Sequence, residues 1–292
     1  MINNTRALDE KSISFEKHFT IEREQEIVIE ALAIYCPKIS KRKLKLAMKY
    51  GCVWLTSKNR KILRIRKVKK NLSIGDKVSI YYDEAVLFSD IKPAKLIADE
   101  GDYSVWNKPC GMFSQGTKWG DHTSIARWVE VFGLSQNQIP ERSTFLVHRL
   151  DRATNGLIVV AHSKKTTTLL TQLFEQRKIV KHYQAIVEGV YPIEKFKLLD
   201  AEIDDKKASS IVLSSDYDKD TNQSTLLIKI ETGRKHQIRK HLSGVGFPII
   251  GDRLYGASLA QKVDRECSNL MLKSRYLSFD CPMIQIRREY NI

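Results

Sequence analysis

The sequence predicts an α+β protein with two domains of unequal size, and three observations support this fold class. The 292 residues are 42% hydrophobic and 28% charged, which is typical of folded globular chains and long enough for two such domains. Helix-like and strand-like hydrophobic periodicities alternate along the chain. The net charge of +15 is concentrated in one block, because residues 38–77 hold 15 Lys or Arg and a single acid while the rest is nearly neutral.

The basic block contains the helix caps and turn residues of a small folded module. The apolar pattern predicts a helix over residues 22–36 that stops at Pro37, and a second helix over residues 41–50 with Ser40 as its N-cap and Gly51 just beyond its end. Short alternating runs then predict strands near residues 53–55, 63–65 and 78–82. We therefore expect an extension at 1–20, a compact module at 21–83 and a linker at 84–95.

This order of elements resembles the S4-like RNA-binding domain of a ribosomal small-subunit protein and of tyrosyl-tRNA synthetases. The similarity covers roughly residues 38–82 and departs at 55–57, where Leu-Thr-Ser replaces the common Val-Asn-Gly. It implies that the second helix binds RNA through its basic side chains, namely Lys41, Arg42, Lys43, Lys45 and Lys49. A solvated cationic face without a partner remains the alternative.

Several protein classes are excluded or disfavoured. No apolar run approaches the roughly 18 residues of a membrane helix, and residues 1–19 lack the apolar core of a signal peptide. The cysteines are odd in number, scattered and without a C-x-x-C pair, which favours a reducing cytoplasm over a disulfide or zinc framework. They are Cys36, Cys52, Cys110, Cys267 and Cys281. Nothing indicates an oligomer interface, so we expect a monomer that does not bind membranes.

The larger domain, residues 96–292, reads as mixed α and β. Strands are expected near 103–106, 157–161, 183–187 and 225–230, with helices from the Ser163 cap to Arg177 and from about Arg234 to 244–246. Neither nucleotide-binding glycine motif nor H-E-x-x-H occurs. His236 and His241 are five residues apart, which is the wrong spacing for joint metal ligation. An enzyme with this sequence is expected to need no metal and no nucleotide cofactor.

Residues 145–161 contain a candidate nucleophile. Asp151, flanked by Arg149 and Arg152, lies in a polar turn between two apolar β-type runs. Nearby guanidinium groups would keep this carboxylate ionised, as a nucleophile requires. On spacing alone, a structural Asp–Arg pair that braces the turn is the favoured interpretation. The His-Arg-Leu-Asp string does not indicate a kinase, because Asp-Phe-Gly and the Gly-rich loop are missing.

Further segments change that interpretation. Five short motifs follow one another along the chain. They are Asn-Lys-Pro-x-Gly at 107–111, His-Arg-Leu-Asp within 148–156, Lys-x-Tyr-x-Ala within 181–189, Thr-Gly-Arg-x-His-Gln-Ile-Arg-x-His within 232–242 and Gly-x-Pro-Ile-x-Gly-Asp-x-x-Tyr-Gly at 246–256. Together they closely resemble the RluA-type pseudouridine synthases, over about residues 97–277. Asn155 replaces the usual Ser, and Glu231 before the Thr-Gly-Arg string is a milder departure.

The resemblance implies a mixed, mostly antiparallel-sheet pseudouridine synthase domain that isomerises uridine in structured RNA. It makes Asp151 the essential aspartate, Tyr183 the aromatic residue that stacks on uracil, and Arg239 the arginine that pairs with Asp151. It also implies a set of substrate-binding residues, with an arginine that enters the space left by the flipped base. These are Arg149, Ile238, Arg234, His236 and Lys108.

The RNA target stays open at this point. The basic module favours large-subunit ribosomal RNA, with tRNA or both RNAs as alternatives. A non-catalytic RNA-binding protein of the same fold, acting in ribosome assembly, is the alternative from a different class. The presence of Asp151, Tyr183 and Arg239 argues against it, because a pure binder has no need of all three.

Overall fold

The computed structural model describes residues 12–24, 26–58, 61–256 and 269–292, which fall into two compact units. The first unit contains the chain up to Asp90 together with Gly116–Thr123, and the second contains Ile91–Gln115 and Ser124–Ile292. Cys267 and the first 11 residues of the expected extension lie outside the described residues. Among the helices described, none is long and apolar enough to cross a membrane.

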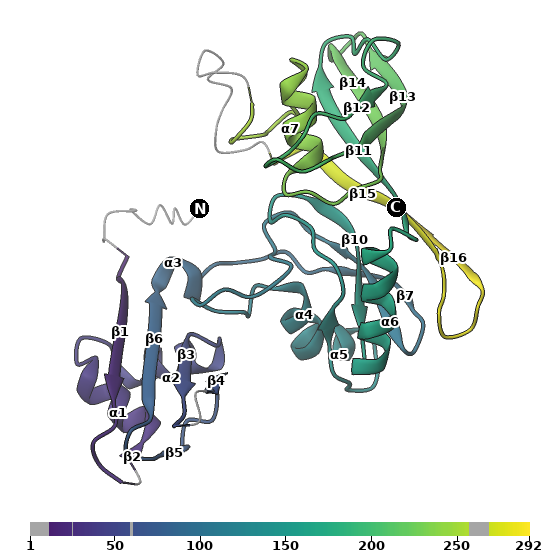
Figure 1. The fold of residues 1–292 in the computed structure, drawn as a ribbon. Helices are drawn as coiled ribbons and strands as arrows, with labels where there is room; N and C mark the ends of the chain where they lie inside the picture. Colours follow the sequence, from purple (N-terminus) through teal and green to yellow (C-terminus); the bar gives the residue numbers. More distant parts are fainter. Residues whose placement is uncertain (1–11, 25, 59–60, 257–268) are drawn as a thin grey trace, which may run out of the picture. The chain divides into compact units, whose positions relative to one another are not determined.

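The first unit is built on a four-stranded antiparallel sheet in the order β1-β6-β3-β4 (Figure 1). The strands of this sheet are β1 (Ser14–Thr20), β3 (Val53–Thr56), β4 (Ile62–Arg64) and β6 (Lys77–Asp83), and a second pair joins β2 (Glu26–Ile27) to β5 (Asn71–Leu72). Strand β1 pairs with β6 along its whole length. The end of the expected N-terminal extension is therefore an edge strand of the module.

Two helices complete this core. Helix α1 (Val28–Tyr35) is shorter than the expected helix, because Glu26–Ile27 pairs with β5 instead. Helix α2 (Lys41–Lys49) begins as predicted at Ser40, whose side chain accepts a hydrogen bond from the Lys43 N–H. It ends before Gly51, whose φ of 77° allows the left-handed turn. Its buried residues are Leu44, Ala47 and Met48.

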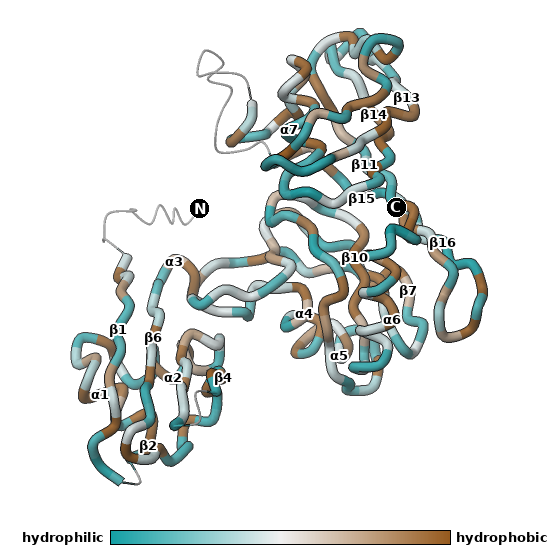
Figure 2. Tube along the Cα trace, in the orientation of Figure 1, coloured by the Kyte–Doolittle hydropathy of each residue, from teal (hydrophilic) through white to brown (hydrophobic). Residues whose placement is uncertain are grey.

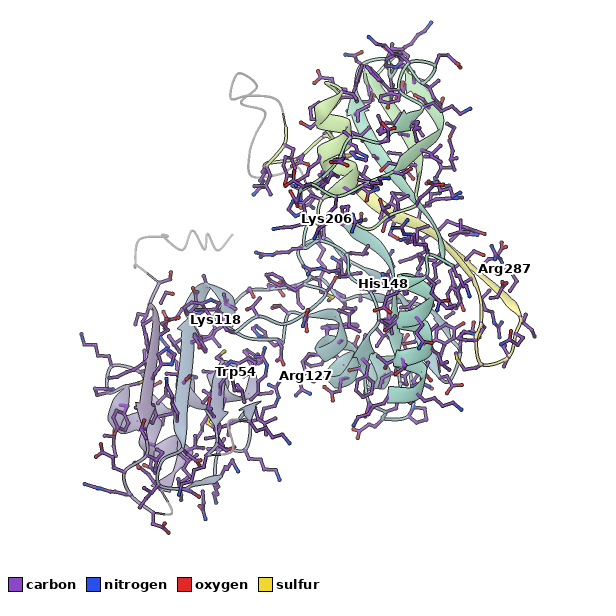
Figure 3. All side chains as sticks on the ribbon, viewed as in Figure 1. Trp54, Lys118, Arg127, His148, Lys206 and Arg287 are labelled. Atoms are coloured by element: carbon purple, nitrogen blue, oxygen red, sulfur yellow. The ribbon has the colours of Figure 1, made fainter. Side chains whose placement is uncertain are left out.

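Two segments outside residues 21–83 also belong to the first unit. Helix α3 (Glu84–Leu87), capped by Asp83, occupies the start of the expected linker. Residues 116–123 pack on the sheet: the Trp54 indole N–H donates to the Lys118 carbonyl at 3.1 Å, and Arg64 donates to the Thr117 carbonyl at 2.7 Å (Figure 3). Such contacts join residues more than fifty positions apart, so no local pattern could predict them.

The second unit contains a ten-stranded sheet with the central order β12-β13-β14-β11-β15-β10-β8-β7. Only β10 and β15 pair in parallel, so the sheet is mixed and mostly antiparallel, as expected. Its strands are β7 (Lys95–Asp99), β8 (Tyr103–Lys108), β9 (Phe145–Leu146), β10 (Asn155–Ala161), β11 (Val180–Glu188), β12 (Leu198–Leu199), β13 (Ser210–Asp218), β14 (Gln223–Ile230), β15 (Leu272–Asp280) and β16 (Arg287–Asn291). All but the first residue of β10 are buried, and the strand is brown over most of its length in Figure 2.

Helices cover two parts of this sheet. Helix α6 contacts β10, and helix α7 contacts β13 (Figure 1). The helical segments are α4 (Ile125–Trp128), the π-helical turn η1 (Val129–Gly133), α5 (Leu134–Gln136), α6 (Lys164–Glu175) and α7 (Gln237–Gly244). Ser163 caps α6 as predicted. Helix α7 begins three residues later than predicted, because His236 has a left-handed φ of 56°.

One glycine allows β10 and β15 to approach closely enough to pair. Gly156 has a φ of 116°, and a Cβ atom there would lie 2.3 Å from the carbonyl oxygen of Ser274. No other residue fits so close a backbone approach. Gly156 lies five residues after Asp151, so this crossing anchors the turn that carries the candidate nucleophile.

Candidate active site

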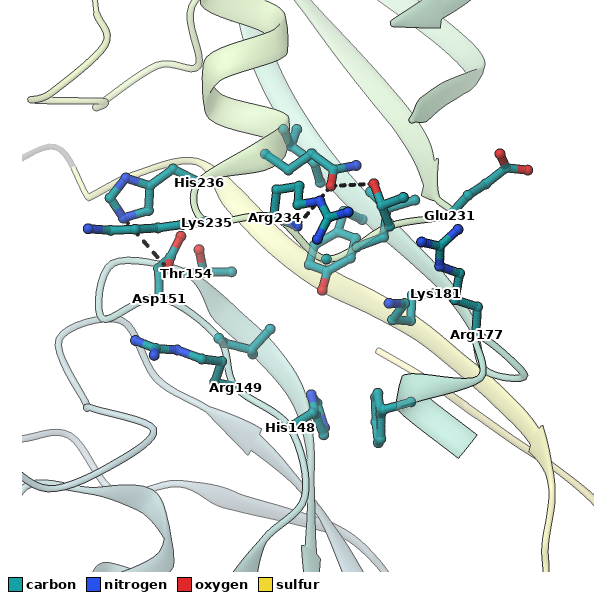
Figure 4. Close-up of a pocket in the computed structure, with 18 of the residues that line it drawn as sticks. His148, Arg149, Asp151, Thr154, Arg177, Lys181, Glu231, Arg234, Lys235 and His236 are labelled. Carbon is teal, nitrogen blue, oxygen red and sulfur yellow. Dashed lines mark hydrogen bonds and ion pairs between the residues drawn. The ribbon is translucent and has the colours of Figure 1, made fainter. Parts of the chain in front are cut away.

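A cavity of about 820 Å³ opens in the second unit, within the size range of ligand pockets (Figure 4). Three segments far apart in the sequence form most of its wall: residues 147–154, 171–183 and 230–239. Of the eight candidate residues of the second unit, seven line it. They are Arg149, Asp151, Tyr183, Arg234, His236, Ile238 and Arg239.

Asp151 lies at the cavity wall in a braced turn. The Ser114 hydroxyl donates to the Leu150 carbonyl at 2.6 Å and accepts from the Leu150 N–H at 2.8 Å. The Thr154 N–H closes the turn by donating to the Asp151 carbonyl at 3.1 Å. The Asp151 side chain remains 26% exposed, so its carboxylate is accessible from the cavity while its backbone is fixed.

The Asp151 carboxylate is in contact with the imidazole of His236. Its Nε2 lies 3.7 Å from Oδ1 of Asp151, and its Nδ1 is 2.9 Å from the Tyr255 hydroxyl. Burial lowers the pKa of His236 below its ordinary value, although Asp151 opposes the shift. The imidazole is therefore neutral at pH 7 and acts beside Asp151 as a polar neighbour rather than a cation.

The flanking arginines do not pair with Asp151, so the structural Asp–Arg pair favoured on spacing is wrong. Arg152 donates from Nε to the Gly111 carbonyl at 3.1 Å and lies over the Phe113 ring. Arg149 is exposed at the cavity, where Figure 4 shows it beside Asp151, and it forms no ion pair with any described residue. Neither flanking guanidinium therefore forms an ion pair with the Asp151 carboxylate, whose described ion-pair partner is His236.

Arg239 also differs from expectation, because its partner is Asp252 rather than Asp151. Its Nε and Nη2 donate to the two carboxylate oxygens of Asp252 at 2.8 and 2.7 Å, in a pair whose side chains are 6% and 1% exposed. The hydrogen bonds that Arg239 donates to Asp252 are the main cause that raises the pKa of Arg239, and Asp151 adds a smaller electrostatic contribution. The two oxygens of Asp252 match the planar fork of the guanidinium. Arg239 therefore influences Asp151 through its charge and not through a direct hydrogen bond.

Lys108 does not face the cavity, which corrects its expected role in substrate binding. It is fully buried, and its ammonium group donates to the carbonyls of Met112 at 2.8 Å, Pro109 at 3.2 Å and Arg152 at 3.5 Å. Burial lowers the pKa of Lys108 to about 8, while Cys110 and Asp151 oppose the shift. Lys108 therefore holds two loops together behind the Asp151 turn.

Tyr183 and Ile238 form apolar parts of the wall. Tyr183, on β11, is 8% exposed, and burial, with a further contribution from Asp151, raises the pKa of Tyr183 to about 12. Ile238 is buried in the first turn of α7. Arg234 is held at the rim, where its Nε donates to the Lys207 carbonyl at 2.9 Å. A ring, an aliphatic group and a carboxylate thus share one cavity.

The sequence did not single out one part of the cavity. His148 stacks on Phe174 with ring centroids 4.3 Å apart, and it accepts a hydrogen bond from the Val159 N–H at 2.9 Å. Arg177 and Lys181 line the same region (Figure 4). Lys181 could have been found, because it precedes Tyr183 by two residues and so lies on the same face of β11. Arg177 could not, since only the fold brings it there.

The basic residues of the first unit fall into two groups. Lys41 pairs with Glu30 and Lys43 with Glu84, both at 2.6 Å, so two of the five candidate RNA contacts are neutralised locally. The other three have side chains without an ion pair to any described residue, and they recur at positions i, i+3 and i+7 of α2. They are Arg42, Lys45 and Lys49, which form one exposed stripe.

Comparison with known proteins agrees with this arrangement. Residues 102–244 match the family model described as RNA pseudouridylate synthase. The chain is 31% identical to ribosomal large subunit pseudouridine synthase D of Borreliella burgdorferi, over 76% of this chain and 73% of that protein. It is 31% identical to tRNA pseudouridine synthase C of Haemophilus ducreyi, over 60% and 81% respectively. The structure of human RNA pseudouridylate synthase domain containing 4 superposes with a TM-score of 0.55, at 24% identity over 68% and 87% of the two chains.

Proposed function

Because this chain belongs to the RNA pseudouridine synthase family, we propose that Asp151 begins the isomerisation of uridine in its cavity. The reaction breaks the N1–C1′ bond, turns the base, joins C5 to C1′ and releases the C5 proton. N1 takes up a proton in exchange, so the nucleotide keeps its composition. The single observation that carries this assignment is the accessible carboxylate of Asp151 on a turn held by Ser114 and Lys108. Asp252, the carboxylate that pairs with Arg239, is buried and does not line the cavity.

A carboxylate suits the first step. Cleavage of a glycosidic bond develops positive charge at the anomeric carbon, which a nearby carboxylate stabilises, as in glycoside hydrolases. Asp151 either adds to C1′ or removes the C2′ proton to give a glycal, and both routes need the same accessible oxygen. Arg239 and Lys108 supply positive charge near Asp151, since Asp151 contributes to the raised pKa of Arg239 and opposes the burial that lowers the pKa of Lys108.

Tyr183 and Ile238 hold the uracil in this proposal. The Tyr183 ring offers a π-face for stacking, and Ile238 offers an apolar contact. Because the pKa of Tyr183 is raised to about 12, its hydroxyl stays protonated at neutral pH. It therefore assists loss of the C5 proton as a relay that gives up one proton while it accepts another, rather than as a free phenolate base.

In this proposal, two arginines and the basic module bind the RNA around the target uridine. A uridine must leave its stack to enter the cavity, at a cost of a few kcal/mol. Arg149, exposed and without an ion pair among the described residues, is suited to stack in the space that the base leaves. Arg234 lies at the rim, and the exposed stripe of α2 is suited to the phosphate backbone.

We infer that large-subunit ribosomal RNA is the target. Support comes from the S4-like arrangement of two helices and a small sheet around the basic stripe, and from the name of the Borreliella burgdorferi relative. The name of the Haemophilus ducreyi relative makes tRNA the second candidate. We also propose that the protein acts in the cytoplasm as a monomer.

The test is tritium release. The full-length protein is incubated with ribosomal RNA or tRNA transcripts that carry tritium at uridine C5, and tritium released to water is counted. We expect release from ribosomal RNA, and none with Asp151→Asn, which retains the shape of the side chain. A wild-type protein that binds these RNAs without releasing tritium from any of them would indicate the non-catalytic assembly factor. Mapping pseudouridine in RNA from cells with and without the gene then identifies the position.

A further inference from the structure

Two cations lie together on one side of the cavity without a counter-ion. Figure 4 shows Arg177 and Lys181 on the side of the cavity away from Asp151, and both line it. Within the described part of the chain, neither side chain forms a hydrogen bond or an ion pair. Of the acids that line the cavity besides Asp151, Glu175 is exposed, and Glu231 is engaged by Ser209 at 3.0 Å and by Lys229 at 3.8 Å.

Among the described residues, the lack of a carboxylate partner for the half-buried Lys181 contrasts with three other cations of this protein. Arg64, Arg142 and Arg239 each pair with a carboxylate. Lys181, by contrast, is half-buried and lies beside Arg177, which is exposed. Burial lowers the pKa of Lys181, and Arg177 lowers it further. A half-buried ammonium group beside a second cation costs free energy that a bound anion would recover.

Both cations lie where the turn after α6 leads into β11. Arg177 has a left-handed φ of 57°, its N–H donates to the Phe174 carbonyl at 3.2 Å, and the next N–H, of Lys178, donates to the Leu173 carbonyl at 2.9 Å. Lys181 is the second residue of β11. Because alternate residues of a strand share a face, Lys181 lies on the same side of β11 as Tyr183. The cation site is thus a fixed neighbour of the ring proposed to hold the uracil.

Uracil itself is neutral, so it does not need two cations. The anion of an RNA substrate nearest to a base in the cavity is a phosphodiester of the same or the adjacent nucleotide. Building on the function proposed above, we propose that Arg177 and Lys181 form a subsite for an RNA phosphodiester flanking the target uridine. Arginine suits this role through its planar fork, and lysine as a compact charge.

The test uses full-length protein and a tritiated RNA that the wild type modifies. Lys181→Met keeps the aliphatic stem without the charge, and Arg177→Gln keeps polarity. Each is expected to lower kcat/KM about five- to twentyfold, mainly through KM, as loss of one charge-assisted phosphate contact predicts. The matched control is Lys178→Gln, an exposed neighbour that does not line the cavity, and it should change kcat/KM less than twofold.

A neutral phosphate analogue identifies the contact. Substrates carry a single methylphosphonate on one side or the other of the target uridine. One of these linkages should cost the wild type at least the factor lost with Lys181→Met, and should cost the Lys181→Met protein less than the wild type, because only the Arg177 contact is left to lose. An equal penalty in both proteins, or an equal loss with Lys178→Gln, overturns the subsite. Thermal melting checks the fold, and we expect Lys181→Met to be as stable as the wild type or more so, because an unpaired partly buried charge is removed.

Failure of the proposed function gives a different result. In that case the wild type releases no tritium from any transcript. The subsite is then tested by fluorescence anisotropy with labelled oligouridylate and its methylphosphonate version. Tighter binding of the charged oligomer that disappears in Lys181→Met supports the subsite, and an unchanged preference overturns it.

Discussion

The guanidinium of Arg239 is paired with Asp252, not with Asp151, through two hydrogen bonds of 2.8 and 2.7 Å in a buried site. Asp252 also accepts from the N–H groups of Leu254 and Tyr255 at 2.9 and 3.0 Å. One carboxylate therefore holds both the first helical turn that carries Arg239 and the loop that carries Tyr255. Through Tyr255 this network reaches His236 and then Asp151.

Removal of either member of the Arg239–Asp252 pair should destabilise the protein. A single substitution leaves an uncompensated buried charge, which typically costs about 3–5 kcal/mol. We expect Arg239→Met to lower the free energy of unfolding by that amount in urea titrations. Arg239→Lys should recover only part of it, because an ammonium group cannot reproduce the two parallel bonds. A loss below about 1 kcal/mol for Arg239→Met would contradict the buried pair.

Acid should weaken the same pair. Burial alone would raise the pKa of Asp252, but the hydrogen bonds from Arg239, Tyr255 and Leu254 outweigh it and lower that pKa below its ordinary value. A carboxyl with a lowered pKa in the folded state stabilises the fold at neutral pH, and this stabilisation is lost as the pH falls through the folded value. Unfolding free energies measured from pH 6 down to pH 3 should therefore fall more steeply in wild type than in Asp252→Asn.

Substitution of Lys108 distinguishes a structural role of this residue from a role in substrate binding. Because its ammonium group holds the carbonyls of Met112, Pro109 and Arg152, Lys108→Met should lower the free energy of unfolding by about 1–3 kcal/mol, the cost of unsatisfied buried groups. It should lower kcat through the disturbed Asp151 turn and leave RNA affinity nearly unchanged. A raised KM with normal stability and normal kcat would support a substrate contact instead.

The lowered pKa of Lys108 also predicts the sign of a pH effect. Its folded value of about 8 lies below the ordinary 10.5, so the unfolded chain binds the additional proton between these values. This residue therefore contributes a stability that increases as the pH rises from about 8 to about 10.5. The difference in unfolding free energy between wild type and Lys108→Met should grow over that window. A constant difference would contradict burial of a protonated ammonium group.

Tyr183 is expected to act through both its ring and its hydroxyl. Tyr183→Phe retains the ring, so KM for RNA should change little while kcat falls about 100-fold or more, the range of a lost proton-transfer group. Tyr183→Ala should raise KM as well. Steady-state tritium release measures both constants. The pH–rate profile of the wild type should show no inflection from this phenol below about pH 11, because its pKa is raised to about 12.

The stripe on α2 predicts how affinity depends on salt. Replacing Arg42, Lys45 and Lys49 together with Gln should weaken RNA binding and reduce the slope of log affinity against log salt by about 3, one unit per lost phosphate contact. The control is Lys41→Gln combined with Lys43→Gln, since both residues pair with glutamates of their own unit. A control that reduces the slope as much as the stripe variant would show that α2 acts through its total charge.

The sequence by itself determined the features that depend on neighbouring residues. The Ser40 and Ser163 caps, the glycine turn after α2, the buried β-run that follows Asp151 and the position of Tyr183 on a strand follow from local propensity and periodicity, and the structure agrees. The family resemblance then brought Asp151, Tyr183 and most of the cavity wall together from separate motifs.

Only the tertiary structure decided which charges meet. Two carboxylates, Asp252 and Asp151, act electrostatically on Arg239 in the folded chain, and sequence spacing cannot rank Asp252 above Asp151. Burial of Lys108 and the exposure of Arg177 to the cavity depend in the same way on segments forty or more residues apart. Ion pairing varies steeply with distance and desolvation, and both are set by packing across the sheet, so a local pattern can name a charged residue but not its partner.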